Sequence, residues 1–194
     1  MNRHLTELCR VLQASDAASH TAHTWGHRLV AIFDRGGKLL VGGNGGSAAE
    51  AQHLTAELVG RFVEERRPLP AIALHSETSS VTAIANDFGY DTVYARQISA
   101  FAGRRDVVLL LSTSGKSQNL LEAVAAARDS GATVWAMTGP RPNPLADLAE
   151  DVIAVDSDDS CVVQEVHLVV VHLVAAAVDA ALRAADYGSE AVPA

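Results

Sequence analysis

Four hydroxyl side chains stand close together in one short segment: Ser112-Thr113-Ser114-Gly115-Lys116-Ser117. This segment follows an apolar run at 106–111 and precedes an alanine-rich helical pattern at 118–129. Hydroxyls and free backbone N–H groups at the start of a helix meet the positive end of its dipole, where anions are stabilised. A single serine there would be an ordinary N-cap. The whole group predicts a phosphate-binding loop, called the phosphate loop below, to which Lys116 adds one positive charge.

A second loop is rich in glycine and reads Gly43-Asn44-Gly45-Gly46-Ser47. Together with Ala48 it fits the loose dinucleotide pattern G-x-G-x-x-A. A dinucleotide site also needs an acidic residue about 20 residues further on, whereas Glu77 lies about thirty residues after this loop. The dinucleotide hypothesis would also leave the phosphate loop without a purpose. We therefore expect Asn44 and Ser47 to contact sugar hydroxyls and a carbonyl, while the glycines permit a tight turn.

His53 and Glu57 are four residues apart in the helical pattern that follows the glycine loop. At this spacing they share one face of a helix. An imidazole and a carboxylate so placed can bind a metal such as zinc or act as a proton-transfer pair. They can also form a plain surface hydrogen bond, which is the commonest outcome of this spacing. Spacing alone leaves all three possibilities open.

The apolar segment 162–182 contains three polar residues of interest, which are Gln164, His167 and His172. Buried polar groups need hydrogen-bond partners, and a lone histidine in such a helix is usually a core residue. Gln164 and His172 are eight residues apart, roughly 12 Å along a helix. Two side chains this far apart on a single helix can hardly bind the same metal ion. If both serve one site, a neighbouring subunit must supply one of them.

The elements that position these residues alternate between strands and helices. Each predicted strand is apolar throughout, which predicts a parallel sheet covered by helices on both faces. Ligands of such sheets bind beyond the carboxyl ends of the strands, where both loops lie. The predicted strands are 38–42, 71–74, 106–111, 133–137 and 152–155. Two helices are predicted before residue 35, and five more at 48–58, 79–85, 92–101, 118–129 and 162–182. We also predict a turn at 86–90, a loop at 139–144 and a tail from residue 184.

Composition narrows the class of protein. The 194 residues are 48% hydrophobic and 20% charged, which indicates one globular domain and excludes a disordered chain. A net charge of −8 disfavours nucleic acid as a partner. Two distant cysteines suit a reducing cytoplasm. The start of the chain lacks the apolar stretch of a signal peptide, and the polar residues within 162–182 argue against a membrane span.

Taken in order along the chain, these motifs resemble the sedoheptulose 7-phosphate isomerases, a family of SIS (sugar isomerase) domain proteins, from about residue 38 to residue 175. Asn86-Asp87-Phe88-Gly89 is a further matching motif. The resemblance implies a flavodoxin-like fold with two N-terminal helices (1–35) that belong to the same unit and help pack the oligomer, a SIS domain (36–183) and a flexible tail (184–194). It also implies a homotetramer with active sites between subunits.

The resemblance further assigns roles to individual residues. It implies one zinc ion per site, held by His53, Glu57, Gln164 and His172. The implied substrate contacts are Asn44, Gly45, Gly46, Ser47, Asn86, Asp87, Ser112, Thr113, Ser114, Ser117 and Gln164. The implied reaction converts sedoheptulose 7-phosphate to D-glycero-D-manno-heptose 7-phosphate. We expect Glu57 to take the carbon-bound proton and His172 to be its acid–base partner, with the carbonyl oxygen polarised by zinc.

Two positions depart from the family pattern. Members often have asparagine at Lys116 and aspartate at Cys161, and the second change removes one expected substrate-hydroxyl contact. A non-catalytic SIS protein that binds a replication initiator or senses sugar phosphates is the alternative. In the initiator-binding group the residues at Gly46, Ser114 and His172 tend to be replaced, so their presence here favours the enzyme.

Overall fold

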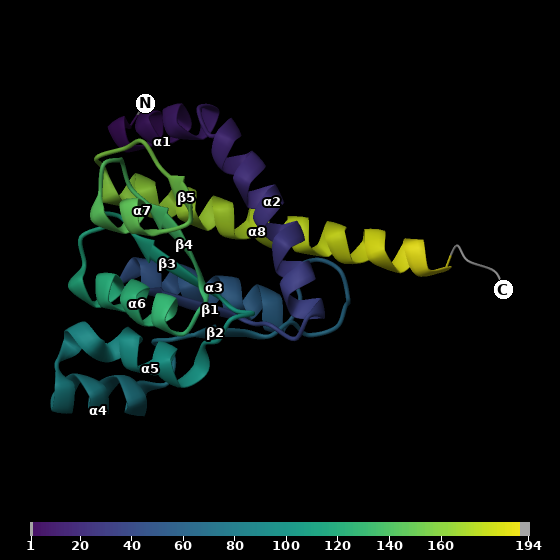
Figure 1. The fold of residues 1–194 in the computed structure, drawn as a ribbon. Helices are drawn as coiled ribbons and strands as arrows, with labels where there is room; N and C mark the ends of the chain where they lie inside the picture. Colours follow the sequence, from purple (N-terminus) through teal and green to yellow (C-terminus); the bar gives the residue numbers. More distant parts are fainter. Residues whose placement is uncertain (1, 191–194) are drawn as a thin grey trace.

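The fold is built on five parallel strands. The structure, a computed structural model, describes residues 2–190, with side chains through Ala185. The strand order is β2-β1-β3-β4-β5, as Figure 1 shows. This order is that of the flavodoxin-like doubly wound sheet, so the predicted fold class is confirmed. The strands are β1 (Leu39–Gly43), β2 (Ala71–Ala73), β3 (Val107–Ser112), β4 (Thr133–Thr138) and β5 (Asp151–Ala154).

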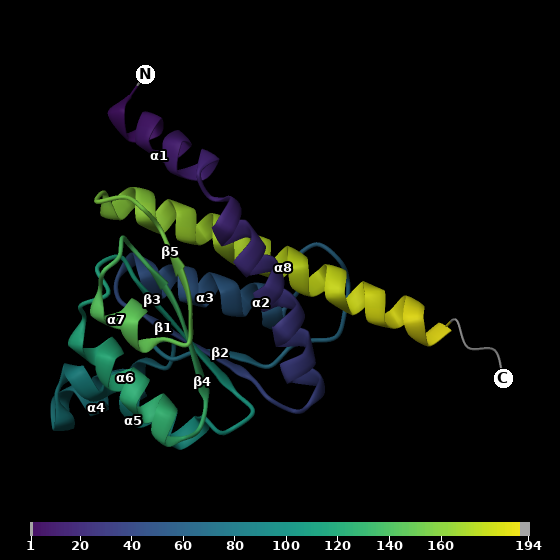
Figure 2. The ribbon, with the colours of Figure 1, turned by 45° about the horizontal axis from the view of Figure 1, so that its top comes forward.

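Helices cover both faces of the sheet because successive strand residues point to opposite sides. In β1, Leu39 and Val41 enter one core, whereas Leu40 enters the other. The first core is closed by α2 (Asp16–Asp34), α3 (Gly46–Val59) and α8 (Ser160–Glu190). The second is closed by α5 (Val93–Phe101), α6 (Gln118–Asp129) and the short α7 (Pro144–Leu148). Figure 2 shows the sheet between these two layers.

Three segments differ from the sequence prediction. Residues 86–88, predicted as part of a turn, form the end of α4 (Thr78–Phe88), and a short 3₁₀ helix (η1, Tyr90–Thr92) follows Gly89. Helix α7, which Asn143 caps through its side chain, begins where a loop was predicted to end. The third difference is that α8 continues to Glu190. Residues 184–190 are therefore helical rather than a tail, while residues 191–194 lie outside the described part.

Helix α8 is apolar enough, by length and composition, to span a membrane. However, 56% of its most apolar window is buried inside the fold. Val170, Val174 and Val178 reach the first core. Helix α8 is therefore a core helix, as its sequence pattern predicted.

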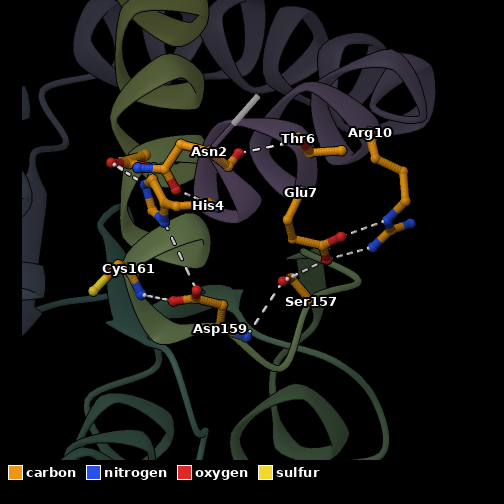
Figure 3. Close-up of polar contacts among 9 residues, drawn as sticks. Asn2, His4, Thr6, Glu7, Arg10, Ser157, Asp159 and Cys161 are labelled. Carbon is orange, nitrogen blue, oxygen red and sulfur yellow. Dashed lines mark hydrogen bonds and ion pairs between the residues drawn. The ribbon is translucent and has the colours of Figure 1, made fainter.

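Helix α1 (Arg3–Gln13) packs on the start of α8 rather than on the sheet (Figures 1 and 2). Its polar side holds the loop before α8, as Figure 3 shows. His4 lies 2.9 Å from a carboxylate oxygen of Glu165, and Ser157 Oγ donates to Glu7 at 3.0 Å. These contacts fix the beginning of the helix that carries Gln164 and His172.

Candidate active site

The phosphate loop begins at the last residue of β3. Ser112 is only 5% exposed, and its Oγ accepts a hydrogen bond from the backbone N–H of Gly115 at 3.0 Å. Gly115 has φ +63°, and an added Cβ would collide with Asn143. The loop is therefore preformed, and the Ser112 hydroxyl shapes it.

Ser117 lies at the N-cap of α6, but its side chain makes no capping hydrogen bond. Its hydroxyl is therefore available to a ligand at the positive end of the helix. Ser114 is exposed, and Thr113 is half-buried. The loop borders a cavity of about 400 Å³ whose polar lining includes Thr113, Ser114, Lys116, Arg141, Asp158 and Ser160. The sequence analysis did not identify Arg141, which precedes Pro142 in the loop after β4.

The glycine loop is tied to the start of α6 by a pair of amide side chains. Asn44 and Asn119 each donate to the other's carboxamide oxygen at 2.9 Å. The hydroxyls of Tyr90 and Tyr94 both lie 3.3 Å from Asn44 Oδ1. The Asn44 side chain thus holds the two loops together, and its predicted contact with sugar stays a prediction. Ser47 is buried, with 3% exposure.

Asn86 and Asp87 lie in the last turn of α4. Their exposed side chains bond to each other at 2.7 Å. Gly89, at φ +87°, ends α4 and turns the chain. The turn leads to Tyr90, which contacts Asn44. Tyr90 therefore links the segment after α4 to the glycine loop, while the substrate contacts predicted for Asn86 and Asp87 stay predictions.

Gln164 also belongs to this part of the molecule. A Cβ added to Gly46 would lie 2.7 Å from the carboxamide atoms of Gln164. Glycine at position 46 therefore lets α3 begin directly against this side chain of α8. The phosphate loop, the glycine loop and Gln164 together are called the loop half-site below.

His53, Glu57 and His172 meet in one chain and form what we call the His–Glu cluster. His53 Nε2 lies 3.0 Å from Glu57 Oε1 and 3.2 Å from His172 Nε2. One potential ligand atom from each residue lies within 4.8 Å of the others. Tetrahedral zinc with Zn–N bonds of about 2.0–2.1 Å places two ligand nitrogens about 3.3 Å apart. The donor set and its spacing therefore fit a metal ion with three protein ligands and an open position.

Gln164 is not part of the cluster within one chain. It lies eight residues before His172, roughly 12 Å along α8, and contacts Gly46 instead. The predicted four-residue ligand set is thus divided, with three members together and the fourth at the loop half-site. This is the separation that the helical spacing predicted.

A buried polar pair lies between these two parts. Glu50 on α3 and His167 on α8 approach to 3.8 Å, and within the described residues Glu50 Oε2 and His167 Nδ1 have no hydrogen-bond partner. Burial raises the pKa of Glu50 to about 8. Burial also lowers the pKa of His167 to about 4. Both groups are therefore uncharged near neutral pH. His167 Nε2 pairs with the Thr138 carbonyl at 3.2 Å, which fits the core role predicted for it.

Sequence reasoning missed several residues around the site. Asn119 and Tyr90 contact the Asn44 side chain. No motif or spacing in the sequence indicated these contacts. His75 follows β2 at the carboxyl edge of the sheet, and neither of its ring nitrogens has a partner in the described part of the chain. Burial lowers the pKa of His75. Phe62 lies beside His172, with ring centres 5.7 Å apart.

Comparisons with known proteins agree with this geometry. Residues 5–139 match the SIS domain family. The chain is 53% identical to a phosphoheptose isomerase of Streptomyces coelicolor, over 97% of this chain and 81% of that protein. It is 47% identical to a probable phosphoheptose isomerase of Thermoplasma acidophilum, over 78% and 84% of the two chains.

Solved structures of phosphoheptose isomerases are also similar to this chain. A phosphoheptose isomerase from Neisseria gonorrhoeae superposes with a TM-score of 0.83 at 34% identity, covering 91% of this chain and 95% of that one. One from Francisella tularensis superposes with a TM-score of 0.80 at 33% identity, covering 91% and 92%.

Proposed function

Because the chain belongs to the phosphoheptose isomerase family of SIS domain proteins, we propose that it converts sedoheptulose 7-phosphate to D-glycero-D-manno-heptose 7-phosphate. The chain is a sugar-phosphate isomerase of heptose biosynthesis. The observation that carries the detailed proposal is the meeting of His53, Glu57 and His172, which come from α3 and α8 and are partly buried. The protein has two free cysteines and a net negative charge. Both features are typical of a soluble enzyme in the reducing cytoplasm, which is the location we propose.

We further propose that the resident metal is zinc and that a complete site uses two subunits. Glu57 lies eleven residues after Gly46, about 16 Å along α3, and His172 lies about 12 Å from Gln164 along α8. The His–Glu cluster and the loop half-site of one chain are therefore far apart on both helices. A homotetramer in which the cluster of one subunit faces the loop half-site of another would unite them. Exposed Leu5 (50%) and Leu12 (37%) on α1 offer apolar surface for such packing.

The proposed reaction moves one proton between adjacent carbons. The phosphate loop holds the phosphate end of the sugar, so that remote binding energy orients the reacting carbons. Glu57 removes the proton from C1 of the ketose and returns it to C2. His172 protonates O2 and accepts the proton from O1, so that the enediol-like intermediate collapses to the aldose. A bound zinc ion would supply Lewis-acid polarisation of the carbonyl oxygen.

The direct test is incubation of the purified protein with sedoheptulose 7-phosphate, followed by NMR detection of the aldose product. We expect turnover that a strong chelator abolishes and added zinc restores. No aldose at any zinc concentration would refute the proposed reaction and favour a non-catalytic SIS protein. Full turnover by metal-free protein would refute the metal role alone.

A mixing experiment tests the two-subunit site. One variant carries Glu57→Gln and the other Thr113→Val with Ser117→Ala, and each is expected to be inactive. If sites are shared, subunit exchange between the variants should restore about a quarter of wild-type activity, because a quarter of the sites then receive two intact halves. If each site lies within one chain, mixing restores nothing.

A further inference from the structure

Arg66 lies in the segment between α3 and β2, and its side chain is almost fully buried. Side-chain exposure is 7% for Arg66 and 3% for its partner Asp179, and Arg66 Nε donates to Asp179 Oδ1 at 2.9 Å. The same guanidinium donates to the backbone carbonyls of Glu57 at 2.6 Å and Leu58 at 2.9 Å. It therefore binds the last turn of α3 and the side of α8 at once.

The bond to the Glu57 carbonyl satisfies a specific need, whereas the Leu58 carbonyl also accepts the backbone N–H of Leu69 at 3.0 Å. The last carbonyls of a helix have no partner within the helix, and a cation is favoured at that end. Asp179 Oδ2 also accepts weaker bonds from the backbone N–H groups of Val63 and Glu64, at 3.3 and 3.4 Å. Because the guanidinium is planar and rigid, these bonds fix direction as well as distance. The pair thus sets the position of α3 relative to α8.

This junction is adjacent to the His–Glu cluster on both helices. Arg66 binds the backbone of Glu57, the residue whose side chain is the proposed base. Asp179 follows His172 by seven residues, close to two helical turns, so both lie along one stripe of α8. At the other end of α3, Gly46 rests against Gln164. The cluster therefore lies between two fixed contacts of the same helix pair.

Stability alone is a weak reason for such a pair. Burying two charges carries a large desolvation cost, and apolar replacements are often as stable. Catalytic and metal-binding groups, in contrast, must be held to within about 0.5 Å of the productive geometry. We propose that Arg66 and Asp179 are positioning residues for the isomerase site, because they hold α3 and α8 at the spacing at which His53 and Glu57 meet His172. This inference rests on the proposed function of the cluster.

The test compares Arg66→Lys and Asp179→Asn with a matched control, Asp106→Asn. Asp106 is also buried (4% exposed), pairs with Lys38 Nζ at 2.7 Å and accepts a backbone N–H from Gly103 at 2.8 Å, but these partners lie beside the starts of β1 and β3 and belong to neither α3 nor α8. All three variants should lower the melting temperature. Only the first two should weaken zinc binding, by 10- to 100-fold in competition with a chromophoric chelator. At saturating zinc they should lower kcat without changing KM for the sugar phosphate.

A third measurement does not depend on metal or turnover. In zinc-free protein with isotopically labelled histidine, ring-proton NOEs between His53 and His172 should persist in wild type and in Asp106→Asn. In Arg66→Lys and Asp179→Asn they should weaken or vanish. The proposal is overturned if these variants lose only thermal stability, with NOEs, zinc affinity and kcat like those of the control. If Asp179→Asn fails to fold, the milder Arg66→Lys carries the comparison. Lack of isomerase activity in wild type would refute the proposed function but leave the NOE result decisive for the positioning role.

Discussion

Replacing Gly46 by alanine should separate the activity of this protein from its stability. The added Cβ would lie 2.7 Å from the carboxamide of Gln164, whereas ordinary van der Waals contact begins at 3.4 Å. The carboxamide must therefore retreat by about 0.7 Å. It is the far end of a flexible side chain, so the retreat costs little folding energy. Alanine in a helix is also more favourable than glycine by about 0.5–1 kcal/mol, so the unfolding free energy should change by less than about 1 kcal/mol.

Turnover should respond very differently. Misplacement of a site group by about 1 Å costs on the order of 100-fold in rate, and we expect Gly46→Ala to lose 10- to 100-fold in kcat/KM. The assay is NMR or coupled detection of aldose formation, with chemical denaturation run in parallel. Gln164→Ala provides the matched control. If Gly46 acts through Gln164, the double variant should be no worse than the worse single variant. Wild-type activity in Gly46→Ala, or additive losses in the double variant, would refute the reasoning.

Three further predictions concern the helices. Glu57→Gln should fold normally by circular dichroism yet turn over at least about 100-fold more slowly; near-normal turnover would remove Glu57 as the base. His53→Ala should lose the bound zinc in elemental analysis, whereas His23→Ala, from the exposed His23–His27 pair on α2, should retain it. Equal zinc content in both would exclude the proposed ligand. Burial raises the pKa of the Glu50 carboxyl from 4.5 to about 8, so the native state binds this proton more tightly than the unfolded state does. The protonated carboxyl therefore contributes to the free energy of unfolding below about pH 4.5, and this contribution is lost as the pH rises through 8. Glu50→Gln should therefore gain stability relative to wild type between pH 5 and pH 8.5, and an unchanged pH dependence of the denaturation midpoint would contradict the burial argument.

Much of the fold could be predicted because parallel strands buried on both faces are apolar throughout. The run 106–111 differs from the observed β3 by one residue at each end. The end of α4 could not be predicted in the same way. Asn86 and Asp87 favour turns by residue type, but Gly89, rather than either of them, ends the helix.

The candidate site was predictable wherever residues act through local spacing. The four-residue spacing of His53 and Glu57 places them on one face, and the eight-residue spacing of Gln164 and His172 predicted that they would separate. Contacts between distant segments left no such signal. The pairing of Asn44 with Asn119, and of Arg66 with Asp179, joins residues 75 and 113 positions apart, which no periodic pattern can reveal.

Substrate binding is assigned to loops and proton transfer to helices, and this separation affects how related proteins can change in evolution. Phosphate and sugar are assigned to strand-end loops, and loops tolerate insertion and substitution better than packed helices do. The groups proposed to transfer the proton lie on α3 and α8, whose facing surfaces belong to the core. Substrate preference can therefore drift through loop changes while the same chemistry is inherited intact.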